Sequence, residues 1–382
     1  MWRIPFGKVE IGDVARRNLE QALQRGHVTE GPLVEEFEKA FAQKFAWKHA
    51  VATSSGTDAG MVAWRAVREA MDSQLVIAHS VLTPACAFVA TTNCILAAGL
   101  RPLFIDVDLD TLNLSRASCE ATLANVDDSV IGMQFVSTMG KPSPIDTISD
   151  IAKKHELFLL NDACESHGAM LPEHKYADHW ADAAIYSFYP AHLVVGVEGG
   201  MICTNDDAFA DLCRSIKSHG RAPGSTYFDF QRIGFNSKWS DLHAAVALES
   251  LEGFDARFAR RRFLRRRMIE ELAPWEDRLI LYRDNDARGE VTAPHAFPIV
   301  LRDEDENIEP LYKHLEANGI QCKTLFGSLP TQHAAFRFLG YDAGDFPVAE
   351  RIGRTGLHFG CNEFMTEEDV PYIGSVFEKF FK

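Results

Sequence analysis

The sequence has few features of a secreted, membrane-bound or metal-binding protein. Its eight cysteines are scattered and none are paired as Cys-x-x-Cys, so neither a disulfide framework nor a metal site is expected. No stretch reaches the roughly 18 consecutive apolar residues that a membrane-spanning helix needs. The N-terminus also lacks the charged segment, apolar core and cleavage site of a secretory signal. These absences predict a protein of the reducing cytoplasm that does not enter a membrane.

Basic residues are scarce relative to acidic ones. Lysine and arginine number 39 against 54 aspartates and glutamates, which gives a formal net charge of -15. This balance argues against sequence-independent nucleic-acid binding, because such binding requires many phosphates to be neutralised. A nucleotide as a small ligand stays possible, since a pocket can be locally basic on an acidic protein.

Length and pattern predict two domains. The 382 residues exceed what one hydrophobic core usually organises. We expect a large domain over residues 1–245, with helices at its N-terminus, and a smaller domain over residues 246–382.

Short apolar runs alternate with helix-like segments over the first part of the chain. The expected strands are residues 49–53, 74–78, 101–107, 129–136, 157–161, 183–188 and 200–204, and the expected helices are 56–71, 84–98, 143–155 and 206–217. This alternation predicts an α/β fold, with a mostly parallel sheet covered by helices.

The second part of the chain has a different pattern. Residues 240–270 predict one long helix, and we interpret its arginine run at 260–267 as a solvated face. Strands at 296–301 and 320–325 and helices at 307–318 and 366–381 follow, which predicts a smaller α+β C-terminal domain.

Three segments carry residues suited to chemistry. The SSGT at 54–57 follows a strand and opens a helix, where free N–H groups can bind phosphate, although such residues also serve as plain caps. Asp162 follows an apolar strand, and it can pair with a protonated ring nitrogen or simply cap a helix. The segment AAIYSFYPAHLVVGVEGG brings Ser187 and His192 to a turn, and its paired glycines predict a tight turn or a close backbone approach.

Six segments resemble, in the same order along the chain, those of the DegT-type sugar aminotransferases. They are SSGT, TPACAFVATTN, NDACESHGA, SFYPAH…EGG, HGR and GFNSK. The resemblance runs from GHVTEGPLVEEFEKAF near residue 26 to the C-terminal helix. It implies the fold of the type I pyridoxal 5'-phosphate enzymes, with a large cofactor-binding domain and a smaller C-terminal one. It also implies a nucleotide-sugar substrate.

The resemblance assigns cofactor contacts to individual residues. Gly56, Thr57 and Ser187 would bind the cofactor phosphate. Asn236 would reach that phosphate from the neighbouring subunit, which implies a homodimer with shared active sites.

Three further residues would contact the cofactor ring. Phe88 would stack on it, and Asp162 would keep its nitrogen protonated so that the ring accepts electrons. Glu165 stands where these aminotransferases usually have a glutamine near the ring hydroxyl, so its contact departs from the family pattern.

His192 is the departure that affects the reaction. It occupies the position of the lysine that bonds covalently to the cofactor in the aminotransferases, and no lysine lies between Lys175 and Lys217. A histidine at this position is typical of the nucleotide-sugar 3-dehydratases, such as GDP-4-keto-6-deoxymannose 3-dehydratase. Lys238 and the segments GIQCKTLFGSLPTQHAAF and HFGCNEF also resemble that subgroup. The cofactor, as pyridoxal or pyridoxamine 5'-phosphate, would then be held without a covalent bond.

The subgroup implies a specific reaction. His192 would act as the catalytic base, since imidazole titrates near neutral pH, and the C3 hydroxyl of a 4-keto-6-deoxy hexose would be removed. Residues 219–235 contain no cysteine, so no iron-sulfur cluster is expected, and L-glutamate would regenerate pyridoxamine phosphate.

Three alternatives remain open on the sequence. The chain could be a sugar aminotransferase that works without the usual lysine, or another lyase or epimerase on this scaffold. It could also be a sugar-nucleotide sensor without activity, and His192 could be merely structural. The nucleotide and the sugar are not identified, because the loops at 219–232 and 326–334 depart most from the relatives.

Overall fold

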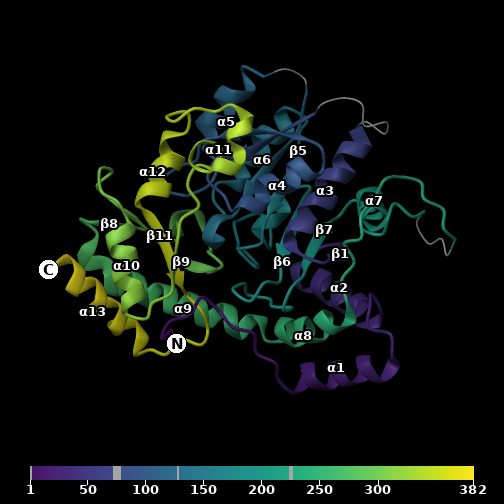
Figure 1. Ribbon diagram of the computed structural model, residues 1–382, viewed down its shortest axis with the longest axis horizontal. Coiled ribbons are helices and arrows are strands. Elements are labelled where there is room, and N and C mark those ends of the chain that lie inside the picture. The colour runs from purple at the N-terminus through teal and green to yellow at the C-terminus, as the bar shows by residue number, and fades with distance from the viewer. Residues whose placement is uncertain (1, 72–78, 127–128, 223–226) are drawn as a thin grey trace.

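The computed structural model describes residues 2–71, 79–126, 129–222 and 227–382, which form two sheets surrounded by helices (Figure 1). The larger sheet has the strand order β1-β7-β6-β5-β4-β2-β3. Its strands are β1 (His49–Thr53), β2 (Ser80–Pro84), β3 (Arg101–Ile105), β4 (Val130–Val136), β5 (Phe158–Asp162), β6 (Ala183–Ser187) and β7 (Gly200–Thr204). Neighbours from β3 to β6 run parallel, and β7 is antiparallel to both β6 and β1. The predicted α/β class with a mostly parallel sheet is confirmed.

Helices cover both faces of this sheet because its strands are apolar on both sides. Residues of α3 (Gly56–Met71), α4 (Val89–Ala97) and α7 (Asp207–Lys217) form one buried cluster with one face. Residues of α2 (Pro32–Phe45), α5 (Arg116–Leu123), α6 (Ile145–Lys154) and α8 (Asp241–Glu252) form the cluster on the other. The N-terminal helix α1 (Asp13–Arg25) lies outside α8 (Figure 1).

The second sheet is antiparallel throughout, in the order β10-β11-β9-β8. Its strands are β8 (Leu279–Leu281), β9 (Ala296–Leu301), β10 (Cys322–Thr324) and β11 (Gly356–Gly360). The helices after α8 are α9 (Phe254–Leu272), α10 (Glu309–Ala317), α11 (Leu329–Gln332), α12 (Pro347–Thr355) and α13 (Asp369–Phe381). The N-terminus joins this half of the molecule, since Ile4 bridges to Ile320 and packs in its core (Figure 1).

Two predicted elements differ from the structure, and a third cannot be compared. The helix expected over 84–98 begins only at Val89, because strand β2 includes Pro84 and residues 85–88 form bends and an isolated bridge before the helix starts. The long helix expected over 240–270 is two helices that meet at Gly253, a residue with low helix propensity. This break lets α8 pack under the large sheet while most of α9 packs under the second one. The strand expected at 74–78 lies outside the described residues.

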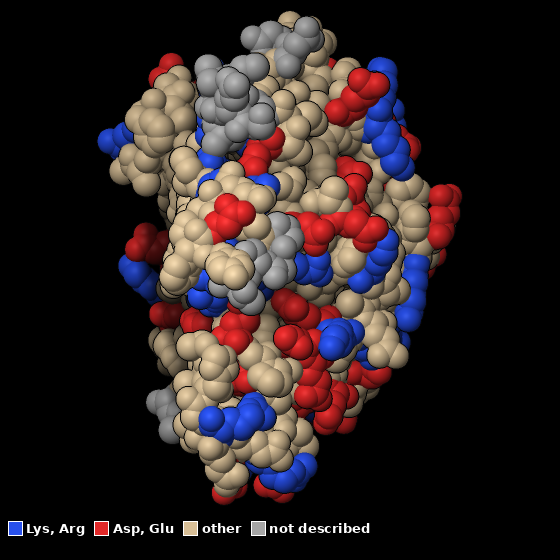
Figure 2. Space-filling view, turned by 90° about the vertical axis from the view of Figure 1, so that its right-hand side faces the viewer, with Lys and Arg blue, Asp and Glu red and all other residues tan. Residues whose placement is uncertain are grey.

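Charges of both signs are mixed on the face that carries α1 and α7 (Figure 2). Among the described residues of that face, lysine and arginine side chains do not gather into one broad patch (Figure 2). Among the described helices, none is long and apolar enough to cross a membrane.

Candidate active site

One cavity of about 410 Å³ contains nearly all the predicted site residues. It opens at the C-terminal ends of β5 and β6, where open α/β sheets bind ligands, and the second sheet closes its other side. The predicted residues that line it are Gly56, Thr57, Phe88, Asp162, Glu165, Ser187 and His192. Asn236 does not line it.

The predicted phosphate site lies at the start of α3. Gly56 begins this helix so close to β6 that a Cβ added there would lie 2.8 Å from the Ser187 Cβ. A Cβ at Gly200 would collide with the Ser55 carbonyl, which confirms the close backbone approach predicted for the paired glycines. The first N–H groups of a helix lack intrahelical partners. This cradle therefore fits a phosphate group.

Asp162 is buried at the end of β5. Its carboxylate accepts hydrogen bonds from the Thr91 hydroxyl at 2.9 Å and from the Cys164 N–H at 3.3 Å. Burial raises the pKa of Asp162, and no ion pair joins it to another described residue. A protonated ring nitrogen would supply the missing positive charge and reverse that shift, so the residue fits the predicted cofactor.

Glu165 carries a protonated carboxyl group, whereas a glutamate side chain is ordinarily an ionised carboxylate. Its Oε2 accepts from the Met139 N–H at 2.7 Å, and its Oε1 lies 3.8 Å from His295 Nε2. Burial raises the pKa of Glu165 to about 8. The carboxyl is therefore protonated at neutral pH, so one of its terminal atoms donates and the other accepts, as in a glutamine amide. The chemical departure from glutamine is smaller than the sequence indicates.

Phe88 stands at the mouth of the cavity. It precedes α4, its side chain is 58% exposed, and its ring lies 5.9 Å from that of Phe326. An exposed ring on a cavity wall is free to stack on a planar ligand.

His192 follows β6 in a turn, where its N–H bonds to the Tyr189 carbonyl at 2.9 Å. The side chain is 8% exposed, and its Nδ1 is buried without a hydrogen-bond partner. Burial, with added repulsion from Arg261 and Lys323, lowers the pKa of His192 to about 3. The imidazole is therefore neutral at physiological pH, which is the form that accepts a proton, although it is a weaker base than an exposed histidine.

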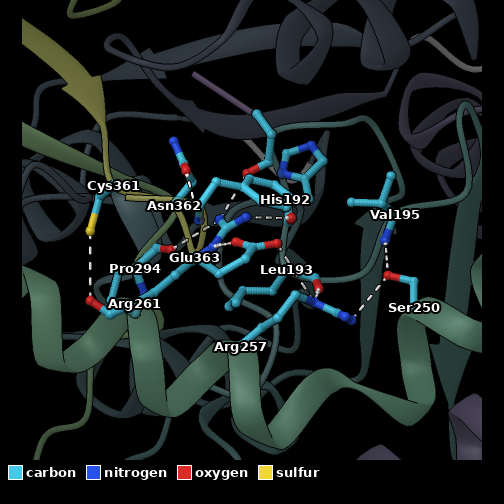
Figure 3. A network of polar contacts seen from close by, with 12 residues as sticks. His192, Leu193, Val195, Ser250, Arg257, Arg261, Pro294, Cys361, Asn362 and Glu363 are labelled. Atoms are coloured by element: carbon cyan, nitrogen blue, oxygen red, sulfur yellow. Dashed lines mark hydrogen bonds and ion pairs between the residues drawn. The ribbon is translucent and has the colours of Figure 1, made fainter. Parts of the chain in front are cut away.

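Two arginines of α9 hold the backbone of this turn (Figure 3). Arg261 is fully buried and donates to the carbonyls of Ala191 at 2.9 Å and of His192 at 3.0 Å. Its Nε also pairs with Glu363 at 2.7 Å. Arg257 donates to the Leu193 carbonyl at 3.2 Å. The arginine run at 260–267 is thus not simply a solvated face, as the sequence suggested, because one of its members, Arg261, is buried and holds the His192 turn.

The second sheet contributes polar side chains that the sequence did not indicate. His295, at the start of β9, lies with its ring 4.9 Å from that of His192. Lys323 of β10 and His358 of β11 line the same wall. Lys323 and His358 belong to the segments GIQCKTLFGSLPTQHAAF and HFGCNEF, but the resemblance gave neither residue a role of its own, and His295 lies outside those segments, in PHAF.

Asn236 and Lys238 lie together on the loop before α8. Both side chains are exposed, and the backbone of Asn236 pairs with that of Ser218. The role assigned to Asn236 in a neighbouring subunit stays a prediction.

The chain is similar in sequence and in fold to known proteins. The chain is 28% identical to GDP-perosamine synthase of Caulobacter vibrioides, over 90% of this chain and 88% of that protein. It is 29% identical to dTDP-4-dehydro-2,6-dideoxy-D-glucose 3-dehydratase of Saccharopolyspora spinosa, over 98% and 86% respectively. The structure of E. coli GDP-4-keto-6-deoxy-D-mannose-3-dehydratase with bound hydrated PLP has the same fold, with a TM-score of 0.87, 22% identity, and coverage of 98% of this chain and 99% of that one.

The family assignment rests on the whole length of the chain. Residues 10–378 match one family of pyridoxal-phosphate-dependent proteins. This range includes both sheets and every residue that lines the cavity. The chain therefore belongs to the DegT/DnrJ/EryC1/StrS aminotransferase family.

Proposed function

We propose that this protein is a nucleotide-sugar 3-dehydratase that removes the C3 hydroxyl of a 4-keto-6-deoxy hexose. The enzyme would bind pyridoxamine 5'-phosphate without a covalent bond, and L-glutamate would regenerate this form of the cofactor. The working enzyme would be a cytoplasmic homodimer. The observation that carries the proposal is His192, a neutral imidazole with a buried, unpartnered Nδ1 at the family's lysine position.

The walls of the cavity supply binding and orientation. When bound, the cofactor supplies an amine that condenses with the sugar ketone and a ring that accepts electrons. Gly56, Thr57 and Ser187 bind the phosphate, and Asp162 holds the ring nitrogen in its protonated form. Glu165 donates a hydrogen bond beside the ring because its carboxyl is protonated.

His192 moves the proton. Its neutral ring takes a proton from the cofactor C4′ and returns it to the departing C3 hydroxyl, which leaves as water. A weak base suits this second step, because a proton is released readily from a group of low pKa. Arg261 and Arg257 keep the ring in place by holding the carbonyls of residues 191–193.

Product analysis tests the proposal directly. The purified enzyme is given cofactor, L-glutamate and a panel of GDP-, CDP-, UDP- and dTDP-linked 4-keto-6-deoxy sugars. We expect a 3-deoxy sugar together with 2-oxoglutarate from one of them. The proposal fails if the product is only a stable aminosugar. In the His192→Lys variant we expect amine transfer to increase while dehydration is lost.

The second candidate function is amine transfer to the sugar. Two observations favour it: the similarity to GDP-perosamine synthase and the presence of Lys323 on the cavity wall. If Lys323 bonds to the cofactor, borohydride reduction will attach the cofactor to that lysine, which peptide mass spectrometry detects. Under the dehydratase proposal, the cofactor stays extractable after reduction and denaturation.

A further inference from the structure

The cavity has an unequal distribution of charge. Its lining includes the acidic residues Asp162, Glu165 and Glu198, but Lys323 is the only lysine or arginine among the described lining residues. Within the described part of the chain, Lys323 forms no ion pair. Its Nζ lies 4.7 Å from the centre of the Phe6 ring, a contact that places the charge without neutralising it.

Two buried histidines share this wall with Lys323. His295 and His358 are 7% and 2% exposed, and the Nδ1 of each is buried without a hydrogen-bond partner. Burial lowers the pKa of both, and the charge of Lys323 adds to the effect. Both rings are therefore neutral, so each has one N–H donor, and both residues line the cavity. A cation beside two neutral donors is suited to an anion with several acceptor oxygens.

The position of Lys323 discriminates between the anions that the proposed reaction uses. Lys323 lines the same cavity as His192 and Glu165, so its charge faces the space in which the reaction would take place. The amine of glutamate must reach this point, and its α-carboxylate is attached to the same carbon. The diphosphate of a nucleotide sugar is attached at C1, across the sugar ring from the reacting C4. A carboxylate can therefore reach the lysine more directly than the diphosphate can.

We propose that Lys323, assisted by His295 and His358, binds a carboxylate of the amino-acid donor. The inference rests on the proposed function, because it concerns the step in which glutamate regenerates the cofactor amine. It divides the cavity into a wall that holds the cofactor and a wall that receives the donor. Because the sugar occupies the same space near His192, donor and sugar must bind alternately.

Two measurements on the cofactor-loaded enzyme test Lys323. The first is the affinity for glutarate, a dicarboxylate without an amine, by titration calorimetry. The second is the KM and kcat for 2-oxoglutarate formation from L-glutamate. In Lys323→Ala we expect glutarate binding to weaken roughly 10-fold to 100-fold, since a charged hydrogen bond is lost, and KM to rise similarly with kcat less affected. Lys323→Arg should restore most of the affinity. Lys313→Ala, an exposed lysine of α10, is the control.

The outcomes separate this inference from the proposed function. Unchanged glutarate affinity in Lys323→Ala would overturn the inference. So would a loss confined to nucleotide-sugar affinity, which would place the diphosphate at this lysine. If the wild-type enzyme forms no 2-oxoglutarate, the proposed function fails, while glutarate binding still tests the lysine. Lys323→Gln, which keeps most of the side-chain volume, shows the same loss if charge is the cause.

Discussion

The two walls of the cavity carry different kinds of polar side chain. The wall from the large sheet has a helix start at Gly56, a buried acid at Asp162 and the turn that presents His192. The wall from the second sheet has Lys323 with His295 and His358. The first is suited to a phosphate and a protonated ring, and the second to an anion or to sugar hydroxyls. If the proposed function is right, cofactor binding and substrate choice reside on separate sheets of the molecule.

The largest effect should come from the first wall, at Asp162. Under the proposed function, replacing it with alanine would leave the ring nitrogen of the cofactor without its counter-charge in a buried site. Breaking a buried ion pair costs about 3–5 kcal/mol, so we expect turnover to fall by about 10²-fold to 10⁴-fold. Cofactor affinity, followed by the absorbance of the bound cofactor, should fall as well. Normal turnover in Asp162→Ala would remove the ring contact from the mechanism.

The first wall could be predicted from the sequence because its residues belong to continuous segments. Gly56 and His192 follow strands and Asp162 ends one, so the strand pattern brings these residues to one edge of the sheet, and the resemblance to the family gave them their roles. The second wall could not be predicted this way. Lys323 and His358 lie on strands β10 and β11 of an antiparallel sheet and His295 directly precedes β9, and only the packing of the two sheets brings them to the cavity.

Two other features depended on tertiary contacts. The arginine run of α9 has the composition of an exposed helix, but Arg261 is buried because it pairs with Glu363 and with backbone carbonyls. The protonation of Glu165 depends on its burial, which residue type alone does not indicate. The break at Gly253 had a local cause, and the residue's low helix propensity was the available signal.

The link between α9 and the first wall gives the next prediction. In Arg261→Gln, Glu363 loses its closest ionic partner and the His192 turn loses two donors. We expect the free energy of unfolding to fall by about 3 kcal/mol, as measured by urea denaturation. The acidic limb of the pH-rate profile should also move to higher pH, because Arg261 lowers the pKa of His192.

The exposed Arg266 of the same helix provides the control for this variant. Arg266→Gln should leave both the unfolding curve and the pH-rate profile unchanged. If Arg261→Gln loses stability but keeps the wild-type pH profile and kcat, then the arginine is structural and does not position His192.

The second wall is tested by His295→Asn and His358→Asn. Each variant removes an imidazole but keeps a short polar side chain, so we expect kcat/KM for the sugar nucleotide or the donor to fall about 10-fold, the cost of one hydrogen bond. Cofactor affinity should not change, because neither residue belongs to the first wall. If cofactor affinity falls together with kcat/KM, the two walls are not functionally separate.

The smallest effect is expected for Glu165→Gln, on the border between the walls. Burial holds the pKa of Glu165 at about 8, above its ordinary value of 4.5. Between these two values the folded state keeps a proton that the unfolded chain has released, so this residue makes stability decrease as pH rises through that window.

The protonated carboxyl donates its hydrogen bond below about pH 8 and loses that donor above it. Glutamine donates at every pH, so Glu165→Gln should retain near wild-type activity at neutral pH. It should also lose the alkaline limb of the pH-rate profile. A wild-type pH-rate profile that is flat through pH 9 would show that Glu165 is ionised in the working enzyme. The carboxyl would then have no hydrogen-bond donor, and it would not act as a glutamine does.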